Sequence, residues 1–380
     1  GGNMLGCCGS TGRRLGTMAM TKKGVTIDDT TLQWCPSRIP QIWPNTNAKL
    51  NSLRIFQAWS TQWPAEGRAE AHQQLADWVK AHGAKVLVGT PVTCDAAADL
   101  VSWQWTKELL QVLEPGYVMG LAVGNELELL YSQEGIDSNC ITELWGGGRL
   151  WSTFTSRVAE FDQMGFGSIP VTSVFTAAVL DGNPFLEDPS KGLVNTFLKQ
   201  ATAKYHTRFA FTFNIYPYFD PNLKMNLGTT TDCSLALHQA SCWDSTTCLG
   251  PAIMVSARNK IQQLTGSPAS LFWVGEIGWS SPRASALGTD MESCEAFSSL
   301  ETFQTFYKGF LEWDFTLAGV APPDHVFYFT LRNALNFGQQ EYFGLINSCE
   351  SMACKIASPG FEAEQCEVTP PGGDGGAGPL

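Results

Sequence analysis

Membrane-spanning and targeting signals are missing from this sequence of 380 residues. No apolar run approaches the roughly 20 uncharged residues that a transmembrane helix needs. The first residues, GGNMLGCCGSTGRRLG, also lack a hydrophobic signal-peptide region, as expected for a mature or trimmed chain. No Asn-x-Ser/Thr sequon occurs, so N-glycosylation gives no indication of the compartment. We expect a protein without a membrane span.

Positive charge is scarce. Lys and Arg total 24 against 36 Asp and Glu, which gives a net charge of -12. A chain this acidic is poorly suited to a nucleic-acid surface or to docking on anionic lipid. We therefore expect a neutral substrate and no nucleic-acid partner, and the oligomeric state stays open.

Several catalytic and cofactor motifs are also absent. No Gly-x-Gly-x-x-Gly turn follows the first strand-like run, and GCCGSTGRR lacks the Lys-Ser/Thr of a phosphate-binding loop. The five histidines are scattered, and no serine-nucleophile elbow accompanies them. These absences argue against nucleotide binding and against a Ser/His/Asp hydrolase, and we expect neither a cofactor nor a metal.

Cysteine, in contrast, is abundant, with 12 residues. An even number this large is typical of disulfide-bonded proteins and predicts a secreted or lumenal location, although spacing alone cannot choose the pairs. The alternative is a zinc site at Cys233, His238, Cys242 and Cys248. Because no Cys-x-x-Cys pair is present, we interpret TDCSLALHQASCWDSTTCLG as a loop stapled to itself.

Strand-like apolar runs alternate with helical patterns along most of the chain. The eight runs are 24–28, 52–59, 84–91, 117–126, 169–176, 209–219, 270–279 and 325–333. Between them lie amphipathic segments such as EAHQQLADWVKAHG, in which Gly83 can cap a helix. Mostly apolar strands that alternate with helices predict an α/β fold with a covered parallel sheet. At this length we expect a closed (β/α)8 TIM barrel, with an open doubly wound sheet as the alternative.

Composition divides the chain into three parts. Residues 1–22 precede the first strand and form an N-terminal extension, which we expect to pack against the barrel through Cys7 or Cys8. The single barrel domain, with disulfide-stapled loops, occupies 23–357. The remaining stretch, 358–380, is rich in Pro, Gly and acidic residues, as in a tail or linker.

Two carboxylates end strand-like runs. Glu126 closes the fourth run and Glu276 closes the seventh. In such a barrel the carboxyl ends of the strands form one mouth, where catalytic groups lie. Two carboxylates across one mouth are what cleavage of a glycosidic bond requires.

Three segments, VGNE (123–126), NIYPYF (214–219) and VGEIGWSS (274–281), resemble the signature segments of glycoside hydrolase family 17. This is the β-1,3-glucanase family, which belongs to the retaining (β/α)8 glycosidases. The last segment keeps the family's Glu-x-Gly-Trp-x-Ser pattern. Weaker similarities in SLRIF, KVLVGTP and EYFGLIN follow the family's order, so the resemblance extends over about residues 24–347.

The resemblance implies a role for individual residues. Glu126 matches the family's acid/base and Glu276 its nucleophile in a double displacement. Asn125 matches the Asn that holds the hydroxyl next to the reacting carbon. Tyr216 is expected to hydrogen-bond the nucleophile or line a sugar subsite, and Trp279 to offer a ring face to a sugar.

The sequence departs from the family at the substrate subsites. On the second strand, Phe56 and Gln57 stand where the family has a hydroxyl and a carboxylate. After the eighth strand, FTLRNALNF places Asn333 near the position of an acidic residue and lacks the family's lysine. Phe56 and Asn333 are therefore expected to make different contacts with the substrate.

Three functions are consistent with these residues. The first is a retaining hydrolase of β-1,3-glucan, with a β-glucan polysaccharide or oligosaccharide as substrate. The second is a β-1,3-glucanosyltransferase on the same site, in which a sugar hydroxyl replaces water. The third is a catalytically weak glucan-binding or structural wall or matrix protein, which the departures at the subsites would explain.

Overall fold

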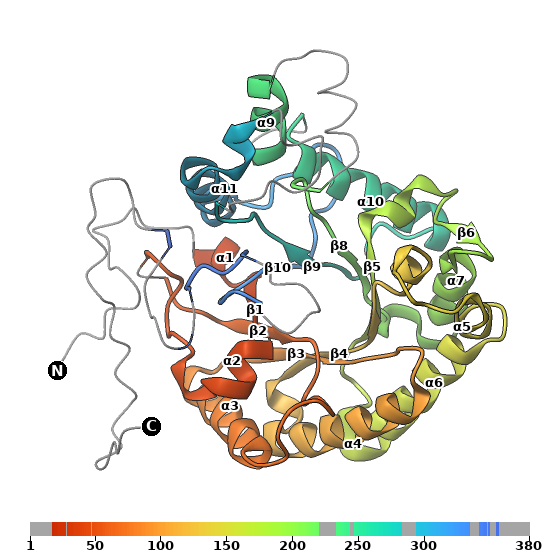
Figure 1. Ribbon diagram of the computed structural model, residues 1–380. Coiled ribbons are helices and arrows are strands. Elements are labelled where there is room, and N and C mark those ends of the chain that lie inside the picture. Colours follow the sequence, from red (N-terminus) through yellow and green to blue (C-terminus); the bar gives the residue numbers. More distant parts are fainter. Residues whose placement is uncertain are drawn as a thin grey trace, which may run out of the picture.

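Eight parallel strands close into a barrel (Figure 1), in the order β1-β10-β9-β8-β5-β4-β3-β2. The computed structural model describes residues 17–27, 29–46, 48–219, 233–243, 247–282, 294–334, 342–347, 349 and 355–356. The barrel strands are β1 Lys23–Ile27, β2 Ser52–Ile55, β3 Lys85–Thr90, β4 Val118–Asn125, β5 Val171–Thr176, β8 Phe211–Asn214, β9 Phe272–Ile277 and β10 His325–Tyr328. The predicted (β/α)8 fold is confirmed, and the open sheet was the wrong alternative.

Helices surround the barrel (Figure 1). They are α1 Thr17–Met20, α2 Asp29–Trp34, α3 Arg68–His82, α4 Ala96–Leu113, α5 Ser138–Leu144, α6 Arg149–Phe161, α7 Val194–Tyr205, α9 Cys233–Ser241, α10 Leu249–Thr265 and α11 Leu300–Glu312. Short turns of helix are η1 Pro36–Arg38, η2 Pro115–Tyr117, η3 Leu127–Ser132, η4 Asp162–Phe166, η5 Ala177–Asp181, η6 His206–Arg208 and η7 Glu295–Ser298. A small hairpin, β6 Glu187–Asp188 and β7 Gly192–Leu193, follows β5.

The side chains along each strand point alternately into two apolar cores. One set of side chains packs outward against the helices, and the other fills the barrel interior. The interior cluster consists of Leu87, Ala122, Val174, Ala210, Trp273 and Phe327. Because this interior is filled, polar chemistry is confined to the strand ends and the loops that follow them.

Local signals explain how the elements end. Gly83 ends α3 in the left-handed conformation, with φ of 59°, as its position in the sequence predicted. Asp95 caps α4 by accepting a hydrogen bond from the backbone N–H of Ala98, at 2.9 Å. The run 209–219 was predicted as one strand, but β8 spans only Phe211–Asn214. The residues after Asn214 leave the sheet and form part of the mouth.

Four disulfides lie within the described residues: Cys35–Cys349, Cys94–Cys140, Cys233–Cys294 and Cys242–Cys248. Three of the four candidate zinc ligands are therefore bonded as cystines. The loop prediction is correct for Cys242–Cys248, whereas Cys233 is bonded outside its segment, to Cys294. The predicted contact through Cys7 or Cys8 lies outside the described residues.

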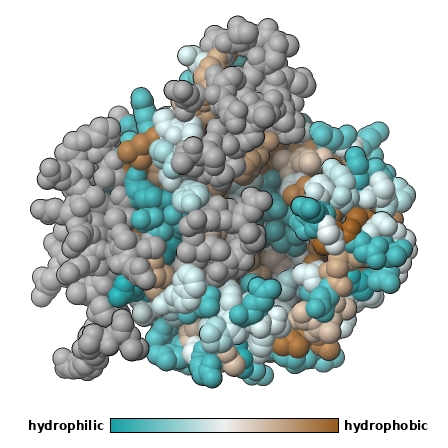
Figure 2. Space-filling view, in the orientation of Figure 1, coloured by the Kyte–Doolittle hydropathy of each residue, from teal (hydrophilic) through white to brown (hydrophobic). Residues whose placement is uncertain are grey.

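The surface of the described part is mainly hydrophilic on the face seen in Figure 2, with hydrophobic side chains in small separate groups. No helix in the described ranges is both long enough and apolar enough to cross a bilayer.

Candidate active site

Glu126 follows directly after β4, where the strand is bent by left-handed backbone. Gly124 has a φ of 81° and Glu126 a φ of 55°. The pairing of β4 with β5 shifts register in the same place, between Ala122 and Asn125. The Glu126 N–H donates to the carbonyl of Val174 at 2.8 Å. This turn ends the strand and leaves the carboxyl half-buried at the barrel mouth.

Glu276 is the residue before the last one of β9, and its side chain is only 8% exposed. The residue before it leaves room for its neighbours. A Cβ at Gly275 would lie 2.6 Å from Oδ1 of Asn214 and 3.0 Å from Nη1 of Arg54. Glycine at this position therefore permits two polar side chains to approach the base of Glu276.

Arg54, one residue before the end of β2, contacts residues on both sides of the site. Its Nη1 donates to Oε1 of Glu276 at 3.0 Å and to the Gly275 carbonyl at 2.8 Å. Its Nη2 donates to Oδ1 of Asn125 at 2.8 Å. The Phe56 ring covers the guanidinium, with 4.4 Å from the guanidinium carbon to the ring centroid. A buried cation thus faces the buried Glu276 carboxylate.

Asn214, at the end of β8, contacts both sides of the same network. Its Nδ2 donates to Oε1 of Glu126 at 2.8 Å, and its Oδ1 accepts from Arg54 at 3.3 Å. Tyr216, two residues later, donates its hydroxyl to Oε2 of Glu276 at 2.6 Å. A hydrogen bond to Glu276 is one of the two contacts that the family resemblance implied for Tyr216.

The two carboxyl groups have different surroundings. Both oxygens of Glu276 accept hydrogen bonds, one from a guanidinium and one from a phenol, as suits a carboxylate. Desolvation by the surrounding protein, followed by the nearby charge of Glu276, raises the pKa of Glu126 to about 8. The raised pKa therefore favours the acid form of Glu126, whereas Glu276 is surrounded by hydrogen-bond donors, and this difference suits the two groups to different roles.

Two of the residues predicted to bind substrate are placed differently from expectation. Trp279 is 0% exposed, and its indole N–H donates to the Phe297 carbonyl at 2.9 Å. It therefore belongs to the core and offers no ring face to a sugar. Asn333 is buried, with Oδ1 accepting from Nζ of Lys355 at 2.6 Å and Nδ2 donating to Asn347. Its amide connects loops of the protein, which corrects its assignment as a substrate-binding residue.

Sequence reasoning missed three residues. Arg54 was visible as a single charge inside the apolar run SLRIF, and Asn214 as a polar residue that ends a strand. Lys355 comes from a downstream segment, yet its Nζ also lies 3.1 Å from Oγ of Ser281, and burial lowers its pKa to about 7. Lys355 thus brings an amino group to Asn333 from a segment further along the chain.

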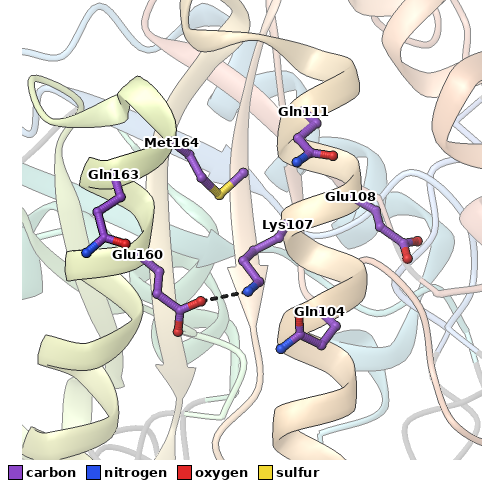
Figure 3. A pocket seen from close by; sticks show the side chains of 7 residues that line it. All are labelled: Gln104, Lys107, Glu108, Gln111, Glu160, Gln163 and Met164. Carbon is purple, nitrogen blue, oxygen red and sulfur yellow. Dashed lines mark hydrogen bonds and ion pairs between the residues drawn. The ribbon is translucent and has the colours of Figure 1, made fainter.

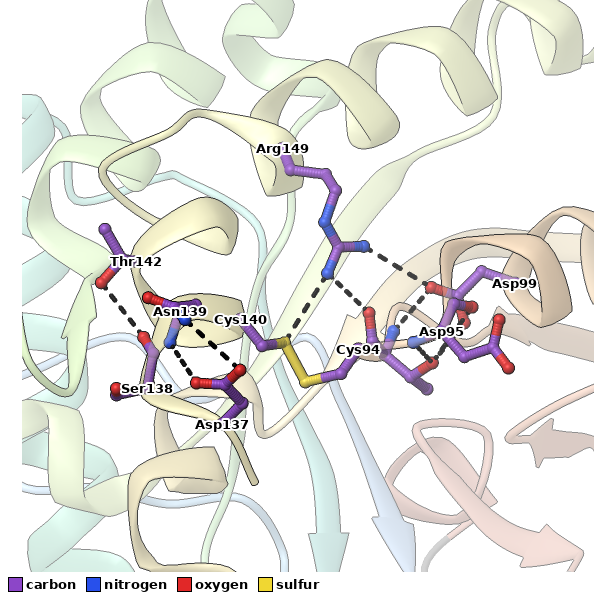
Figure 4. Close-up of a disulfide and its surroundings, with 10 residues drawn as sticks. Cys94, Asp95, Asp99, Asp137, Ser138, Asn139, Cys140, Thr142 and Arg149 are labelled. Atoms are coloured by element: carbon purple, nitrogen blue, oxygen red, sulfur yellow. Dashed lines mark hydrogen bonds and ion pairs between the residues drawn. A yellow bond between two sulfur atoms is a disulfide. The ribbon is translucent and has the colours of Figure 1, made fainter. Parts of the chain in front are cut away.

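A disulfide ties two loops together (Figure 4). Cys94, after β3, is bonded to Cys140 in α5, after β4. Arg149 Nη2 donates to the Thr93 carbonyl at 2.8 Å, and buried Asp99 accepts from the N–H of Thr93 at 2.7 Å. These contacts hold together the loops after β3 and β4, the second of which begins at Glu126.

A hollow of about 380 Å³ lies elsewhere, on the outer helices. Figure 3 shows α4 on one side and the end of α6 with η4 on the other, joined by the ion pair of Lys107 and Glu160 at 2.6 Å. Its lining is Gln104, Lys107, Glu108, Gln111, Glu160, Gln163 and Met164. Neither Glu126 nor Glu276 lines it, so it is not part of the candidate active site.

No family model and no curated protein sequence matches the chain. Among solved structures, it is similar to one of two plant β-glucan endohydrolases with distinct substrate specificities, with a TM-score of 0.51, 15% identity and coverage of 90% of this chain and 96% of that chain. An active-site mutant of a β-1,3-glucanosyltransferase from Rhizomucor miehei, in complex with laminaritriose, has a TM-score of 0.46 and 13% identity, covering 92% of this chain and 99% of that one. At 15% identity the plant enzyme shows a shared barrel fold, and function must be argued from the site.

Proposed function

We propose that this protein is a retaining glycoside hydrolase that cleaves β-1,3-glucan, with Glu276 as nucleophile and Glu126 as acid/base. The observation that carries the proposal is the unequal treatment of two carboxyl groups in one hydrogen-bonded network. Arg54 and Tyr216 donate to Glu276, whereas Glu126 has a raised pKa and accepts from the neutral amide of Asn214. A nucleophile must be ionised and a general acid protonated, so the two environments match the two roles.

The reaction follows in two steps. In the first, Glu276 attacks the anomeric carbon, the bond from that carbon to the leaving oxygen breaks, and Glu126 gives its proton to that oxygen. In the second, water attacks the same carbon, gives a proton to Glu126, and the bond to Glu276 breaks. Both inversions together retain the configuration, and Glu126 ends in its original protonated form.

Substrate contacts come from residues around the pair. Arg54 and Asn214 hold Oδ1 of Asn125, which orients Nδ2 of Asn125 as a donor to the hydroxyl next to the reacting carbon. Phe219 is 47% exposed, and its ring lies 5.5 Å from that of Tyr216 between centroids. Because Trp279 is buried, the rings of Phe219 and half-buried Phe56 are the aromatic surfaces on which a sugar would stack. The family resemblance and the overall negative charge support a neutral β-glucan as the substrate.

Location and chain organisation are part of the same proposal. The four disulfides support an extracellular, secreted or lumenal site of action. We assign residues 23–357 to the hydrolase domain, with 1–22 as an extension and 358–380 as a tail.

Incubation with laminari-oligosaccharides tests the proposal, with product sizes and anomeric configuration followed together by NMR. Short products of retained configuration are expected, and they should vanish in Glu276→Gln and Glu126→Gln. Glu108→Gln, on the outer surface of α4, is the control for a carboxyl-to-amide change away from the site. Products longer than the substrate would identify a glucanosyltransferase instead. Binding without any conversion by the unaltered protein would overturn the enzymatic proposal in favour of a glucan-binding protein.

A further inference from the structure

Glu128 is a buried carboxyl group that the proposed reaction does not use. It lies in η3, two residues after Glu126, and is 1% exposed. Its Oε1 accepts a hydrogen bond from the backbone N–H of Thr176, and its Oε2 has no partner among the described residues. Burial raises its pKa to about 7. A carboxyl in this position is unfavourable unless something is gained from it, because an apolar side chain would be buried more easily.

The surroundings of Glu128 leave it little freedom. A Cβ at Gly192, in β7, would lie 3.2 Å from the Cβ of Glu128 and 3.0 Å from the Trp145 ring. The Glu128 side chain is therefore enclosed, with its Cβ against the hairpin of β6 and β7 and its carboxyl against the end of β5. Its direction toward Thr176 is set by packing as well as by the hydrogen bond.

Two hydrogen bonds join the start of η3 to the end of β5, on either side of Phe175. One runs from the Glu126 N–H to the Val174 carbonyl at 2.8 Å, and the other from the Thr176 N–H to the Glu128 carboxyl. Between these bonds Glu126 keeps left-handed backbone, with φ of 55° and ψ of 35°. Left-handed backbone is unfavourable for a residue with a side chain, so it persists only where neighbouring contacts hold it. The Glu128 carboxyl supplies one of these contacts.

We propose that Glu128 is a positioning residue for Glu126: its carboxyl fixes the turn that aims Glu126 into the mouth and places a negative charge two residues away from Glu126. The inference rests on the proposed function and deepens it. It also explains why the position carries a carboxyl: an amide could make the same hydrogen bond to Thr176 but would bring no charge.

The charge effect must be separated from the other groups that face Glu126. They come from four elements: Glu276 of β9, Asn214 of β8, Arg54 of β2 and Glu128 of η3. Glu276 and Glu128 raise the pKa of Glu126, whereas the Asn214 hydrogen bond and the Arg54 charge lower it. Glu128 ionises around neutral pH, in the range where Glu126 also titrates, so removing its charge must lower the Glu126 midpoint.

Two variants separate the hydrogen bond from the charge. Glu128→Gln retains an oxygen acceptor for Thr176 but removes the charge, and we expect the alkaline limb of kcat/KM to move to lower pH by about half a unit. Glu128→Ala removes both, and we expect kcat to fall about 10- to 100-fold with little change in KM. Glu134→Gln, an exposed position shortly after η3, is the matched control and should leave the profile unchanged. Thermal melts confirm that each variant is folded.

A second readout does not depend on activity. In protein labelled with ¹³C at glutamate carboxyls, the resonance that disappears in Glu126→Gln reports the titration of Glu126. Its midpoint should be lower in Glu128→Gln than in the unaltered protein and unchanged in Glu134→Gln. An unchanged or higher midpoint in folded Glu128→Gln would overturn the inference, as would an unchanged kcat in Glu128→Ala. If the protein cleaves no glucan but the midpoint falls, the proposed function fails and the coupling of Glu128 to Glu126 is supported.

Discussion

Arg54 and Glu276 form a buried ion pair, with 3.0 Å between Nη1 and Oε1 and side-chain exposures of 2% and 8%. The pair crosses the barrel from β2 to β9, strands that are separated in the closed sheet by β1 and β10. A buried ion pair adds little to the stability of a protein, because both charges are removed from water. Removal of one partner is strongly destabilising, because the other charge then stays buried and unpaired. The arrangement is therefore explained better by the chemistry of Glu276 than by stability.

Replacing Arg54 with Met should leave the Glu276 carboxylate buried without its cation. We expect the free energy of unfolding to fall by about 3–5 kcal/mol, as for other broken buried pairs. In a Glu276→Gln background the same replacement should cost clearly less, because no charge is left unpaired. Urea unfolding of the four proteins in this cycle measures the difference. Equal losses in both backgrounds would show that the ion pair does not determine the effect.

The raised pKa of Glu126 predicts the pH dependence of the proposed reaction. A general acid with a pKa raised to about 8 is protonated through neutral pH and loses its proton above that value. We expect kcat/KM for laminari-oligosaccharides to decline on the alkaline side with a midpoint near 8. A decline centred near the ordinary glutamate value of 4.5 would contradict this assignment. An aryl glycoside with a leaving group that needs no protonation should be much less affected by Glu126→Gln.

Tyr216→Phe removes the hydroxyl that donates to Oε2 of Glu276 at 2.6 Å. A hydrogen bond to a charged group contributes about 1.5–3 kcal/mol, so kcat/KM should fall about 10- to 100-fold while the fold is retained. Tyr218→Phe provides the comparison, because the Tyr218 ring packs on Trp279 and Phe343 in the core. Steady-state kinetics should show activity loss at 216 and unchanged activity at 218, where the variant retains the packed ring, and melting curves confirm that both variants are folded. Unchanged kinetics for Tyr216→Phe would remove this residue from the site.

The fold and the carboxyl pair could be predicted because their signals are local. Apolar runs that lead to Glu126 and Glu276 show that each carboxyl lies close to the end of a strand, and the barrel rule places both strand ends at one mouth. Arg54 was visible as a charge in an apolar run, but its partner depends on barrel closure, which brings β2 and β9 into reach. Trp279 matches the tryptophan of the Glu-x-Gly-Trp-x-Ser pattern, yet its burial depends on Phe297, which lies in a separate segment of the chain. Lys355 reaches Asn333 only through tertiary folding, and no local pattern indicates that contact.

His325 predicts a loss of stability in acid. It is buried in β10, with Nε2 2.7 Å from Oγ of Ser52, and burial lowers its pKa to about 3. In the unfolded chain this histidine has its ordinary pKa of 6.5 and binds a proton more readily than in the folded protein. The free energy of unfolding therefore falls as the pH drops from 6.5 toward 3. This histidine alone should lower the free energy of unfolding by about 2 kcal/mol between pH 7.5 and pH 5.

The control is His325→Gln, which keeps a hydrogen-bonding group for Ser52 but does not titrate. Carboxyl groups titrate in both proteins, so the difference between their stability curves isolates the histidine. Urea unfolding at several pH values should give curves that diverge only below about pH 6.5. Parallel curves down to pH 4 would mean that His325 binds a proton as readily in the folded protein as in the unfolded chain.

The disulfides predict an order of stability losses that follows loop length. Cys94–Cys140 closes a separation of 46 residues, and Cys242–Cys248 closes one of 6. In the chain-entropy model their removal costs about 4 and about 2 kcal/mol, because the longer crosslink restricts the unfolded chain more. Replacing each pair with serines and measuring denaturant unfolding tests this order.

Because Cys94–Cys140 also joins the loops after β3 and β4, its loss should lower glucan cleavage as well, whereas the loss of Cys242–Cys248 should affect stability alone. A larger loss of stability for the short loop would show that native contacts at that cystine, and not restriction of the unfolded chain, determine its contribution.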